Sequence, residues 1–386
     1  MINLSVPNLS MDILENLKEC LESGWVSTGG RFIPEFEGKV IKYMKTKYAA
    51  GVQSGTAGLH MSLQVLGVQR DEEVIAPTLT FIAAVNPITY LGANPVFIDC
   101  DDSLCMDPLK LEKFCSEECD YIDGVLINKK TKRKIRALVI VHVFGNMADM
   151  EKIMDIAKKY NLKVLEDATE ALGTYYTEGR YKGKFAGTIG DIGVLSFNAN
   201  KIITTGGGGM VVGDNEELVE KVRFLSSQAK KDTLYFIHDE IGYNYRMLNL
   251  QAALGTSQID QLESFIETKI KNYKIYKEEL EKIEGLEILP FRDGIRANHW
   301  FYSLKIDKEK YGIGRDELLK KLVESNIQTR PIWGLIHQQK PYISCQNYEM
   351  ESSIYYYDRV LNLPCSSSLT EKEVYQVIEK IKEFKK

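Results

Sequence analysis

Short apolar runs alternate with amphipathic stretches through the first two-thirds of the chain. The runs predict strands, and two stretches between them, AGLHMSLQVLGV (57–68) and DMEKIMDIAKKYNL (149–162), have their apolar positions at helical spacing. Strands that alternate with helices are typical of a mainly parallel sheet with helices on both faces. We therefore expect an α/β fold. The predicted strands are 48–53, 73–78, 94–101, 136–145, 162–168, 192–199 and 208–213.

The pattern changes near residue 250. A long polar helix is predicted over 248–283, and shorter mixed elements follow it to the end of the chain. A chain of 386 residues is long enough for a large domain and a smaller one. We expect a large α/β domain over 1–250 and a smaller α+β domain over 251–386, connected by the long helix.

Composition and charge narrow the classes of partner. The chain is 44% hydrophobic and 27% charged, and its formal net charge of −5 gives no electrostatic reason to expect nucleic acid. The basic run KKTKRK (129–134) lies between two apolar runs, which favours a solvated hairpin tip over a binding patch. No apolar run approaches the roughly 20 residues of a membrane span. We expect neither a nucleic-acid nor a membrane partner.

The seven cysteines indicate a reducing compartment. The first residues, MINLSVPNLSMDILENL, have neither the basic start nor the apolar stretch of a secretory leader, so we expect reduced thiols and a cytoplasmic protein. The segment CSEEC (115–119) lacks a second cysteine pair or nearby histidines. It is predicted to be a solvated helix, and no metal site is expected.

Several predicted strands end in polar residues. Each of these residues has an ordinary structural interpretation, such as a helix cap or a buried imidazole. Together they favour a site, because ligands of such sheets bind outside the carboxyl ends of the strands. The residues are Ser54, Gly55 and Thr56, then His142, then Asp167 and Glu170, and then Ser196 to Lys201.

The segment SFNANKIITTGGGGM (196–210) places its lysine before its glycines. A nucleotide-binding P-loop has the opposite order, so this segment favours presentation of the Lys201 amine to a carbonyl. The glycines after Lys201 leave room beside its side chain and allow positive φ values. The alternative is that some of them form a tight turn into the next strand. In SGTAGLH (54–60), small residues at a helix start predict a phosphate held by backbone N–H groups.

An amine, a carboxylate and a phosphate cradle are what pyridoxal phosphate requires. We expect Lys201 to form the Schiff base and Asp167 to keep the pyridine nitrogen protonated. A buried carboxylate about 4 Å from a pyridinium gains on the order of 4 kcal/mol at an effective dielectric constant of 20. The cofactor is therefore predicted to be pyridoxal 5′-phosphate.

Ordered motifs across nearly the whole chain resemble the DegT/DnrJ/EryC1/StrS family of pyridoxal phosphate-dependent nucleotide-sugar aminotransferases. The resemblance implies the aspartate aminotransferase (type I) fold. The motifs are SGWVSTGGRFIPEFE (23–37), SGTAGLHMSL (54–63), PTLTFIAAVNPI (77–88), PVFIDCD (95–101), VHVFGN (141–146), LEDATEALGTYY (165–176), GDIGVLSFNANKIITTGGGGM (190–210), GYNYRMLNLQAALG (242–255), TRPIWGLIHQQKPY (329–342) and LNLPCSSSLT (361–370).

The resemblance implies roles for the residues that bind the cofactor. Lys201 would also shuttle the proton between the two imine tautomers, and Asp167 would pair with the pyridine nitrogen. Glu170 would lie near the ring hydroxyl. Phe81 matches the aromatic residue that stacks on the pyridine face, with simple packing as the alternative. The remaining residues implied to hold the phosphate are Gly55, Thr56 and Ser196.

The resemblance also implies partners. Asn244 matches a residue that reaches the cofactor phosphate of the neighbouring subunit, so a homodimer is expected. Arg330 and His337 match the segment that lines the sugar-nucleotide cleft, with surface solvation as the alternative for both.

The motifs are most similar to the branch that acts on 4-keto-6-deoxy-N-acetylhexosamine nucleotides for bacillosamine- and legionaminic-acid-type sugars. Gly207 stands where many family members have glutamate, which changes the pocket wall. Dehydratases of the family have histidine in place of the lysine, so Lys201 favours transamination. The expected reaction moves the amino group of L-glutamate to the 4-keto carbon of the sugar, for a bacterial surface glycan. A perosamine-type synthase, or a non-catalytic protein that binds the cofactor or a sugar nucleotide, remains an alternative, and UDP and GDP remain open.

Overall fold

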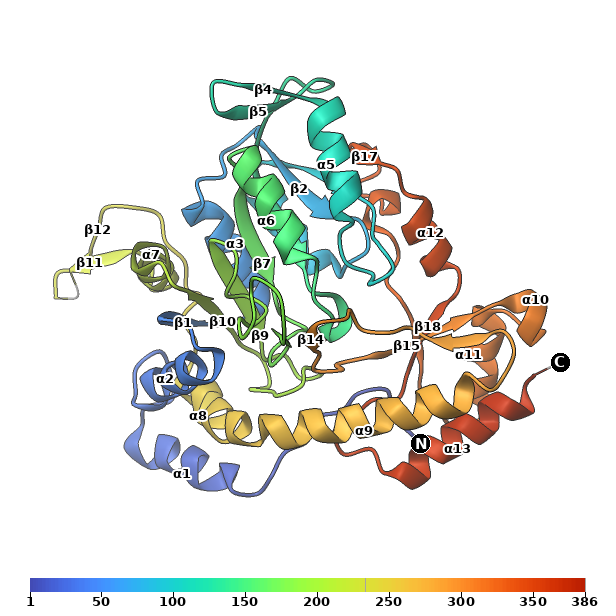
Figure 1. Ribbon diagram of the computed structural model, residues 1–386. Helices are drawn as coiled ribbons and strands as arrows, with labels where there is room; N and C mark the ends of the chain where they lie inside the picture. Colours follow the sequence, from blue (N-terminus) through green and yellow to red (C-terminus); the bar gives the residue numbers. More distant parts are fainter. Residues whose placement is uncertain (233, 386) are drawn as a thin grey trace.

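The computed structural model describes residues 1–232 and 234–385, and a ten-stranded sheet forms its centre (Figure 1). All seven predicted strands are present in this sheet. β10 is antiparallel to both of its neighbours, whereas β9, β7, β6, β2, β3 and β17 are parallel. The main path runs β1 (Tyr48–Val52), β10 (Gly209–Gly213), β9 (Ile192–Ser196), β7 (Lys163–Asp167), β6 (Lys134–Val141), β2 (Glu73–Pro77), β3 (Asn94–Ile98) and β17 (Asn347–Tyr348).

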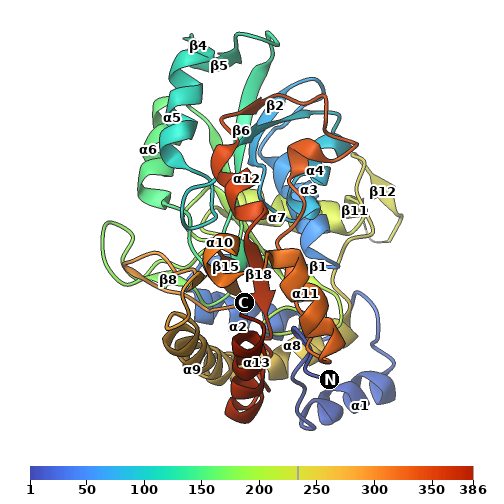
Figure 2. The ribbon, with the colours of Figure 1, turned by 90° about the vertical axis from the view of Figure 1, so that its right-hand side faces the viewer.

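Helices cover both faces of this sheet (Figure 2). α3 contacts β9 and β10, and α6 contacts β7 from the other face. Strands such as β2 are buried at every position, which explains their continuous apolar runs. The α/β fold class is confirmed. The helices are α3 (Gly55–Val65), α4 (Asn86–Tyr90) and α7 (Glu216–Ser226) on one face, and α5 (Pro108–Glu117) and α6 (Met150–Lys159) on the other.

Two hairpins extend from this part of the molecule. β4 (Cys119–Ile122) and β5 (Val125–Asn128) pair and join the edge of β6, so the basic run 129–134 lies at a hairpin tip, as predicted. β11 (Lys230–Asp232) and β12 (Ile237–His238) form the second, which projects away from the sheet at the left of Figure 1.

A second, four-stranded antiparallel sheet is formed by the C-terminal third of the chain. Its order is β13 (Leu286–Ile288), β15 (Tyr302–Ile306), β18 (Val360–Leu363) and β16 (Arg330–Pro331). The helices of this part are α9 (Leu262–Leu280), α10 (Lys308–Tyr311), α11 (Arg315–Glu324), α12 (Glu351–Tyr357) and α13 (Glu371–Glu383).

The long helix predicted over 248–283 is present over most of that range, but a 3₁₀ turn divides it into two helices. The structure has α8 (Asn249–Gln258), a 3₁₀ turn (Ile259–Gln261) and then α9. α8 packs against α1 (Ile13–Ser23) and α2 (Phe32–Met44), whereas α9 packs against α13 and β13. The turn divides the helix at the point where its packing partners change.

The chain passes between the two sheets at several points. Ile2 pairs with Ile327, β17 adds to the large sheet, and β14 (Ile295–Arg296) pairs with β8 (Tyr175–Tyr176). Figure 1 shows both termini at the end of the molecule that holds the small sheet. The division into 1–250 and 251–386 stays a prediction.

The prediction that CSEEC is a solvated helix holds only in part, because residues 115–117 end α5 with Ser116 and Glu117 exposed, whereas the two cysteines are not solvated. Cys115 lies on the inner side of α5 and Cys119 begins β4, and both side chains are buried. The thiols behave as small apolar groups, and burial raises the pKa of each above its usual value. Within the described ranges, no helix is both long enough and apolar enough to cross a membrane.

Candidate active site

A cavity of about 360 Å³ lies at the carboxyl ends of β7 and β9. Seven of the ten predicted site residues line it, and these are Gly55, Thr56, Phe81, Asp167, Glu170, Ser196 and Lys201. A larger groove of about 930 Å³ lies beside Arg292, but most of its charged lining residues are acidic and it includes none of the predicted site residues. The lysine and the carboxylates therefore identify the smaller cavity as the candidate active site.

The start of α3 forms one wall of the cavity. The Ser54 hydroxyl accepts a hydrogen bond from the Ala57 N–H at 3.1 Å and caps the helix. The N–H groups of Gly55 and Thr56 are the first two of the helix, so they have no partner inside it. They border the cavity, where the helix dipole adds partial positive charge. This wall therefore suits a phosphate group.

Glycines allow the backbone to approach closely at this wall. A Cβ on Gly209 would lie 2.6 Å from the Gly55 nitrogen, and a Cβ on Gly55 would lie 3.1 Å from the Ser196 Cβ. The first distance is too short for a side chain. The cradle therefore depends on Gly209, which sequence analysis did not single out as a site residue.

Asp167 ends β7 at the floor of the cavity and is only 4% exposed. Its Oδ1 accepts a hydrogen bond from the Thr169 N–H at 3.1 Å. Burial raises the pKa of Asp167. Across residues 1–232 and 234–385 this carboxylate has no ion-pair partner within 4 Å. A cationic pyridine nitrogen would supply the missing partner, so the residues present fit pyridoxal phosphate.

Lys201 extends into the same cavity, and its Nζ lies 3.6 Å from Glu170 Oε1. The other carboxylate oxygen of Glu170 accepts a hydrogen bond from the Phe144 N–H at 2.9 Å. Burial raises the pKa of Glu170 to about 7, although the nearby Lys201 and the Phe144 N–H oppose the shift. The pair therefore places an amine beside a carboxyl group that exchanges a proton near neutral pH.

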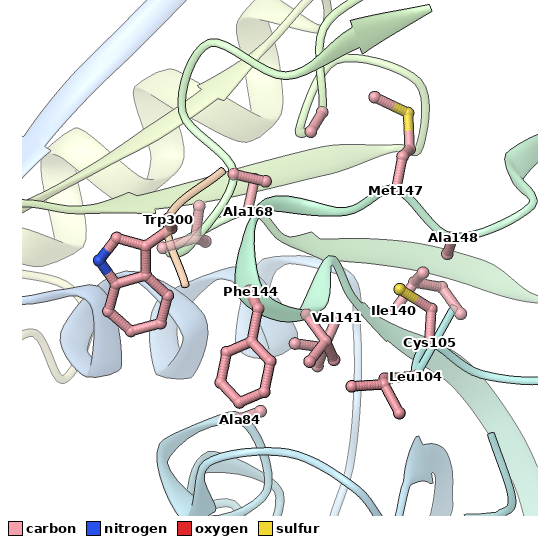
Figure 3. Close-up of a cluster of buried hydrophobic side chains, with 14 of the residues drawn as sticks. Ala84, Leu104, Cys105, Ile140, Val141, Phe144, Met147, Ala148, Ala168 and Trp300 are labelled. Carbon is pink, nitrogen blue, oxygen red and sulfur yellow. The ribbon is translucent and has the colours of Figure 1, made fainter. Parts of the chain in front are cut away.

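Aromatic rings form the remaining walls. The Trp300 ring centroid lies 4.0 Å from Lys201 Nζ, and its Nε1–H donates to the Asn200 carbonyl at 2.9 Å. Trp300 and Phe144 lie beside one another in Figure 3. Phe81 is 54% exposed at the cavity and lies 6.5 Å from Trp333, centroid to centroid.

Trp300 and Trp333 were not predicted as site residues, although Trp333 lies within the motif TRPIWGLIHQQKPY (329–342). Both are more than 98 residues from Lys201 along the chain, and neither belongs to a motif at a strand end of the large sheet. For Trp333 that motif was the available signal, and the rarity of tryptophan, with three in the chain, was the other. Two of the three tryptophans line this cavity.

The glycines after Lys201 behave as predicted at two positions. Gly206 and Gly208 have positive φ values of 77° and 136°. Gly207 lines the cavity, and a Cβ there would meet only the Gln251 side-chain nitrogen, at 3.6 Å. The wall at Gly207 therefore has room for a larger group.

His142 does not line the cavity. Its Nδ1 accepts a hydrogen bond from the Ala148 N–H at 3.2 Å, so its proton is on Nε2, which donates to Glu166 Oε2 at 2.9 Å. Burial alone would raise the pKa of Glu166, but His142 and backbone N–H groups outweigh it and lower this pKa. These two residues are a buried structural pair. The N–H donors to Glu166 belong to Gly187, Ile189 and Gly190.

Three predicted site residues do not line the cavity that the described residues of a single chain form. Asn244 is exposed and its backbone pairs with Ser227. Arg330 is exposed in β16, and His337 Nδ1 lies 2.6 Å from the Thr78 hydroxyl. Their roles stay predictions.

Comparison with known proteins agrees with this geometry. The model of the DegT/DnrJ/EryC1/StrS aminotransferase family matches residues 7–382. GDP-perosamine synthase of Escherichia coli O157:H7 is 36% identical over 379 residues, which are 98% of this chain and 97% of that protein. Two solved structures are each 25% identical to the chain. DesI with its TDP-sugar product has a TM-score of 0.86 and matches 99% of this chain and 92% of its own. DesV of S. venezuelae with a ketimine intermediate has a TM-score of 0.85 and matches 98% of each chain.

The resemblance found in the motifs is therefore confirmed for the family, the fold and the cofactor. A non-catalytic protein is not supported, because the matched proteins are sugar aminotransferases. The chain is a pyridoxal phosphate-dependent sugar-nucleotide aminotransferase, and it belongs to the DegT/DnrJ/EryC1/StrS family.

Proposed function

We propose that the protein transfers the amino group of L-glutamate to the 4-keto carbon of a nucleotide-linked 4-keto-6-deoxy-N-acetylhexosamine. The product is a 4-amino-4,6-dideoxy sugar nucleotide for a bacterial surface glycan. The observation that carries this proposal is the meeting of Lys201, Asp167 and the backbone cradle at Gly55 in one cavity. The open wall at Gly207 supports a substrate with a bulky substituent such as the N-acetyl group.

Each residue of the cavity has a defined task in this proposal. Pyridoxal phosphate, when bound, supplies an electron sink for the transfer. Lys201 attaches the cofactor and, once released, moves the proton to the sugar carbon. Asp167 keeps the positive charge on the ring nitrogen. Proton transfer by a positioned amine is typically worth 10²–10⁴-fold in rate.

The other contacts follow from position. The N–H groups of Gly55 and Thr56 and the Ser196 hydroxyl would hold the phosphate, since all three border the cavity. Phe81 would pack on the pyridine face. Arg330 and His337 would contact the sugar nucleotide from the C-terminal segment that also carries Trp333.

We also propose a homodimer in which Asn244 contacts the cofactor phosphate of the other subunit. The hairpin of β11 and β12 supports this, because it projects from the molecule and exposes Tyr235 (74%) and Phe236 (65%). Ile241, three residues before Asn244, is 84% exposed. Such apolar patches mark association surfaces. The buried free cysteines support a reducing cytoplasm as the location.

The role of Lys201 is tested with a Lys201→Ala variant and Lys184→Ala as a control. Lys184 is a surface lysine that pairs with Asp214. The first variant is expected to lose the absorbance of lysine-bound cofactor and all turnover, whereas the control keeps both. Normal transamination by Lys201→Ala would refute the assignment.

Asn244 is tested by mixing two inactive variants. Lys201→Ala and Asn244→Ala chains, unfolded and refolded together, form mixed dimers in which one site has both native residues. Recovery of about a quarter of the wild-type activity is expected for random pairing. No recovery, with a dimer present, contradicts a shared site.

The substrate is tested with UDP- and GDP-linked 4-keto-6-deoxy sugars, each with and without the N-acetyl group, and glutamate as donor. The proposal expects the highest kcat/KM with an N-acetylated sugar. Preference for the GDP sugar without that group would instead establish a perosamine-type synthase, which the 36% identity to GDP-perosamine synthase favours as the second candidate.

A further inference from the structure

Trp300 belongs to the small-sheet part of the chain, yet its ring lies against the amine of Lys201. The residue lies two positions before the start of β15 and is 3% exposed, and its ring centroid is 4.0 Å from Lys201 Nζ. The side chain of Lys201 is itself only 13% exposed. A contact between an amine and an indole face is strongest when both are removed from water.

Three hydrogen bonds hold Trp300, one through its ring and two through its backbone. Its Nε1–H donates to the carbonyl of Asn200, the residue directly before Lys201. Its backbone N–H donates to the Asn298 side-chain oxygen at 2.9 Å, and its carbonyl accepts from the buried Lys269 amine at 3.1 Å. The indole therefore has one position relative to the turn that carries Lys201.

The same segment also fixes the other neighbour of the amine. The Asn298 side-chain nitrogen donates to the carbonyls of Glu170 and Leu172, both at 2.9 Å. Asn298 is completely buried. One short segment thus bonds to both the Trp300 backbone and the Glu170 backbone, and the Lys201 amine lies 4.0 Å from the Trp300 ring centroid and 3.6 Å from the Glu170 carboxylate.

We infer that Trp300 is a positioning residue for Lys201: its indole face and its bond to Asn200 keep the free amine directed into the cavity during the stages in which the lysine is not attached to the cofactor. A free lysine side chain has several rotatable bonds and loses much freedom when packed. Because the Trp300 ring restricts the Lys201 side chain, the amine does not have to search among many rotamers before it reaches the cavity. This inference rests on the proposed role of Lys201.

The test measures cofactor capture by the cofactor-free protein. Pyridoxal phosphate is mixed with Trp300→Leu, and the absorbance of lysine-bound cofactor is followed by stopped flow. We expect capture to slow about tenfold, and kcat to fall by a similar factor with the sugar KM unchanged. The backbone bonds of residue 300 to Asn298 and Lys269 survive this substitution, so the fold is expected to persist.

Two further variants separate positioning from packing. Trp300→Phe keeps an aromatic face but lacks the Nε1–H donor, and it is expected to recover most of the capture rate. Tyr355→Leu is the matched control. Tyr355 lies in α12, and its exposed ring also contacts a cationic side chain, the Arg359 guanidinium, at 4.2 Å. The control is expected to capture the cofactor at the wild-type rate.

The outcomes distinguish this inference from the proposed function. Folded Trp300→Leu that captures the cofactor as fast as wild type, or faster, overturns the positioning role. Equal slowing in Trp300→Phe and Trp300→Leu overturns the role of the ring face. If mass spectrometry after borohydride reduction finds the cofactor on a side chain other than Lys201 in the wild-type protein, the proposed function itself fails, whatever Trp300 does.

Discussion

Glu170 gives the sharpest quantitative prediction. Its carboxyl group is 5% exposed, and burial raises its pKa from the ordinary value of 4.5 to about 7. Between these two pH values the folded chain holds a proton on Glu170 that the unfolded chain has lost. Stability must therefore fall as the pH rises through this window. The two pKa values correspond to about 3 kcal/mol of unfolding free energy, present below pH 4.5 and lost above pH 7.

The perturbation is Glu170→Gln in the cofactor-free protein. Glutamine has no titrating proton and keeps an oxygen to accept the Phe144 N–H. The unfolding free energy of the variant minus that of wild type should grow by about 3 kcal/mol between pH 4.5 and pH 7.5, because all other groups titrate alike in both proteins.

The assay is urea denaturation at four or more pH values across this window. Infrared spectra give an independent measure, since the band of the protonated carboxyl group should disappear from wild type near pH 7 and be absent from the variant. A stability difference that is flat with pH would refute the reasoning, because it would mean that Glu170 ionises in the fold as it does in water.

Three other substitutions test other parts of the site. Glu166→Gln removes the charge bound to His142, and it should cost about 3 kcal/mol at pH 7. This loss should shrink as the pH falls below 4.5, because the stabilisation from the lowered pKa of Glu166 is complete above 4.5 and is lost as the pH falls toward that lowered pKa. The same urea series, extended to lower pH, checks it. Gly209→Ala should weaken cofactor binding at least tenfold in a fluorescence titration, because its Cβ would collide with the Gly55 nitrogen. The control is Gly38→Ala, which has open space around its Cβ position in α2. It should bind the cofactor normally, and its unfolding free energy should rise by up to about 1 kcal/mol. Gly207→Glu should raise the KM of the N-acetylated sugar without slowing cofactor capture, and an unchanged KM would contradict an open wall as part of the sugar site.

Local chemistry in the sequence was sufficient to predict most of the site. Asp167 ends β7, Lys201 comes shortly after the end of β9, and Gly55 and Thr56 begin the helix that follows β1. Parallel strands bring their carboxyl ends to one edge of the sheet. The order of lysine before glycines excluded a P-loop, and the positive φ of Gly206 and Gly208 agrees with the need for glycine there. The sequence could place these residues at one edge of the sheet because periodicity and turn chemistry depend on neighbouring residues alone, and their roles stay predictions.

Tertiary structure alone decided the rest. Cys115 has a polar sequence context but is buried, because α5 turns that side of the helix toward the core. The helix predicted over 248–283 divides where its packing partners change. Trp300 reaches Lys201 from 99 residues away because the small-sheet segment folds back onto the large sheet. A contact of this kind is fixed by the packing of distant segments, and no local pattern of residues records it.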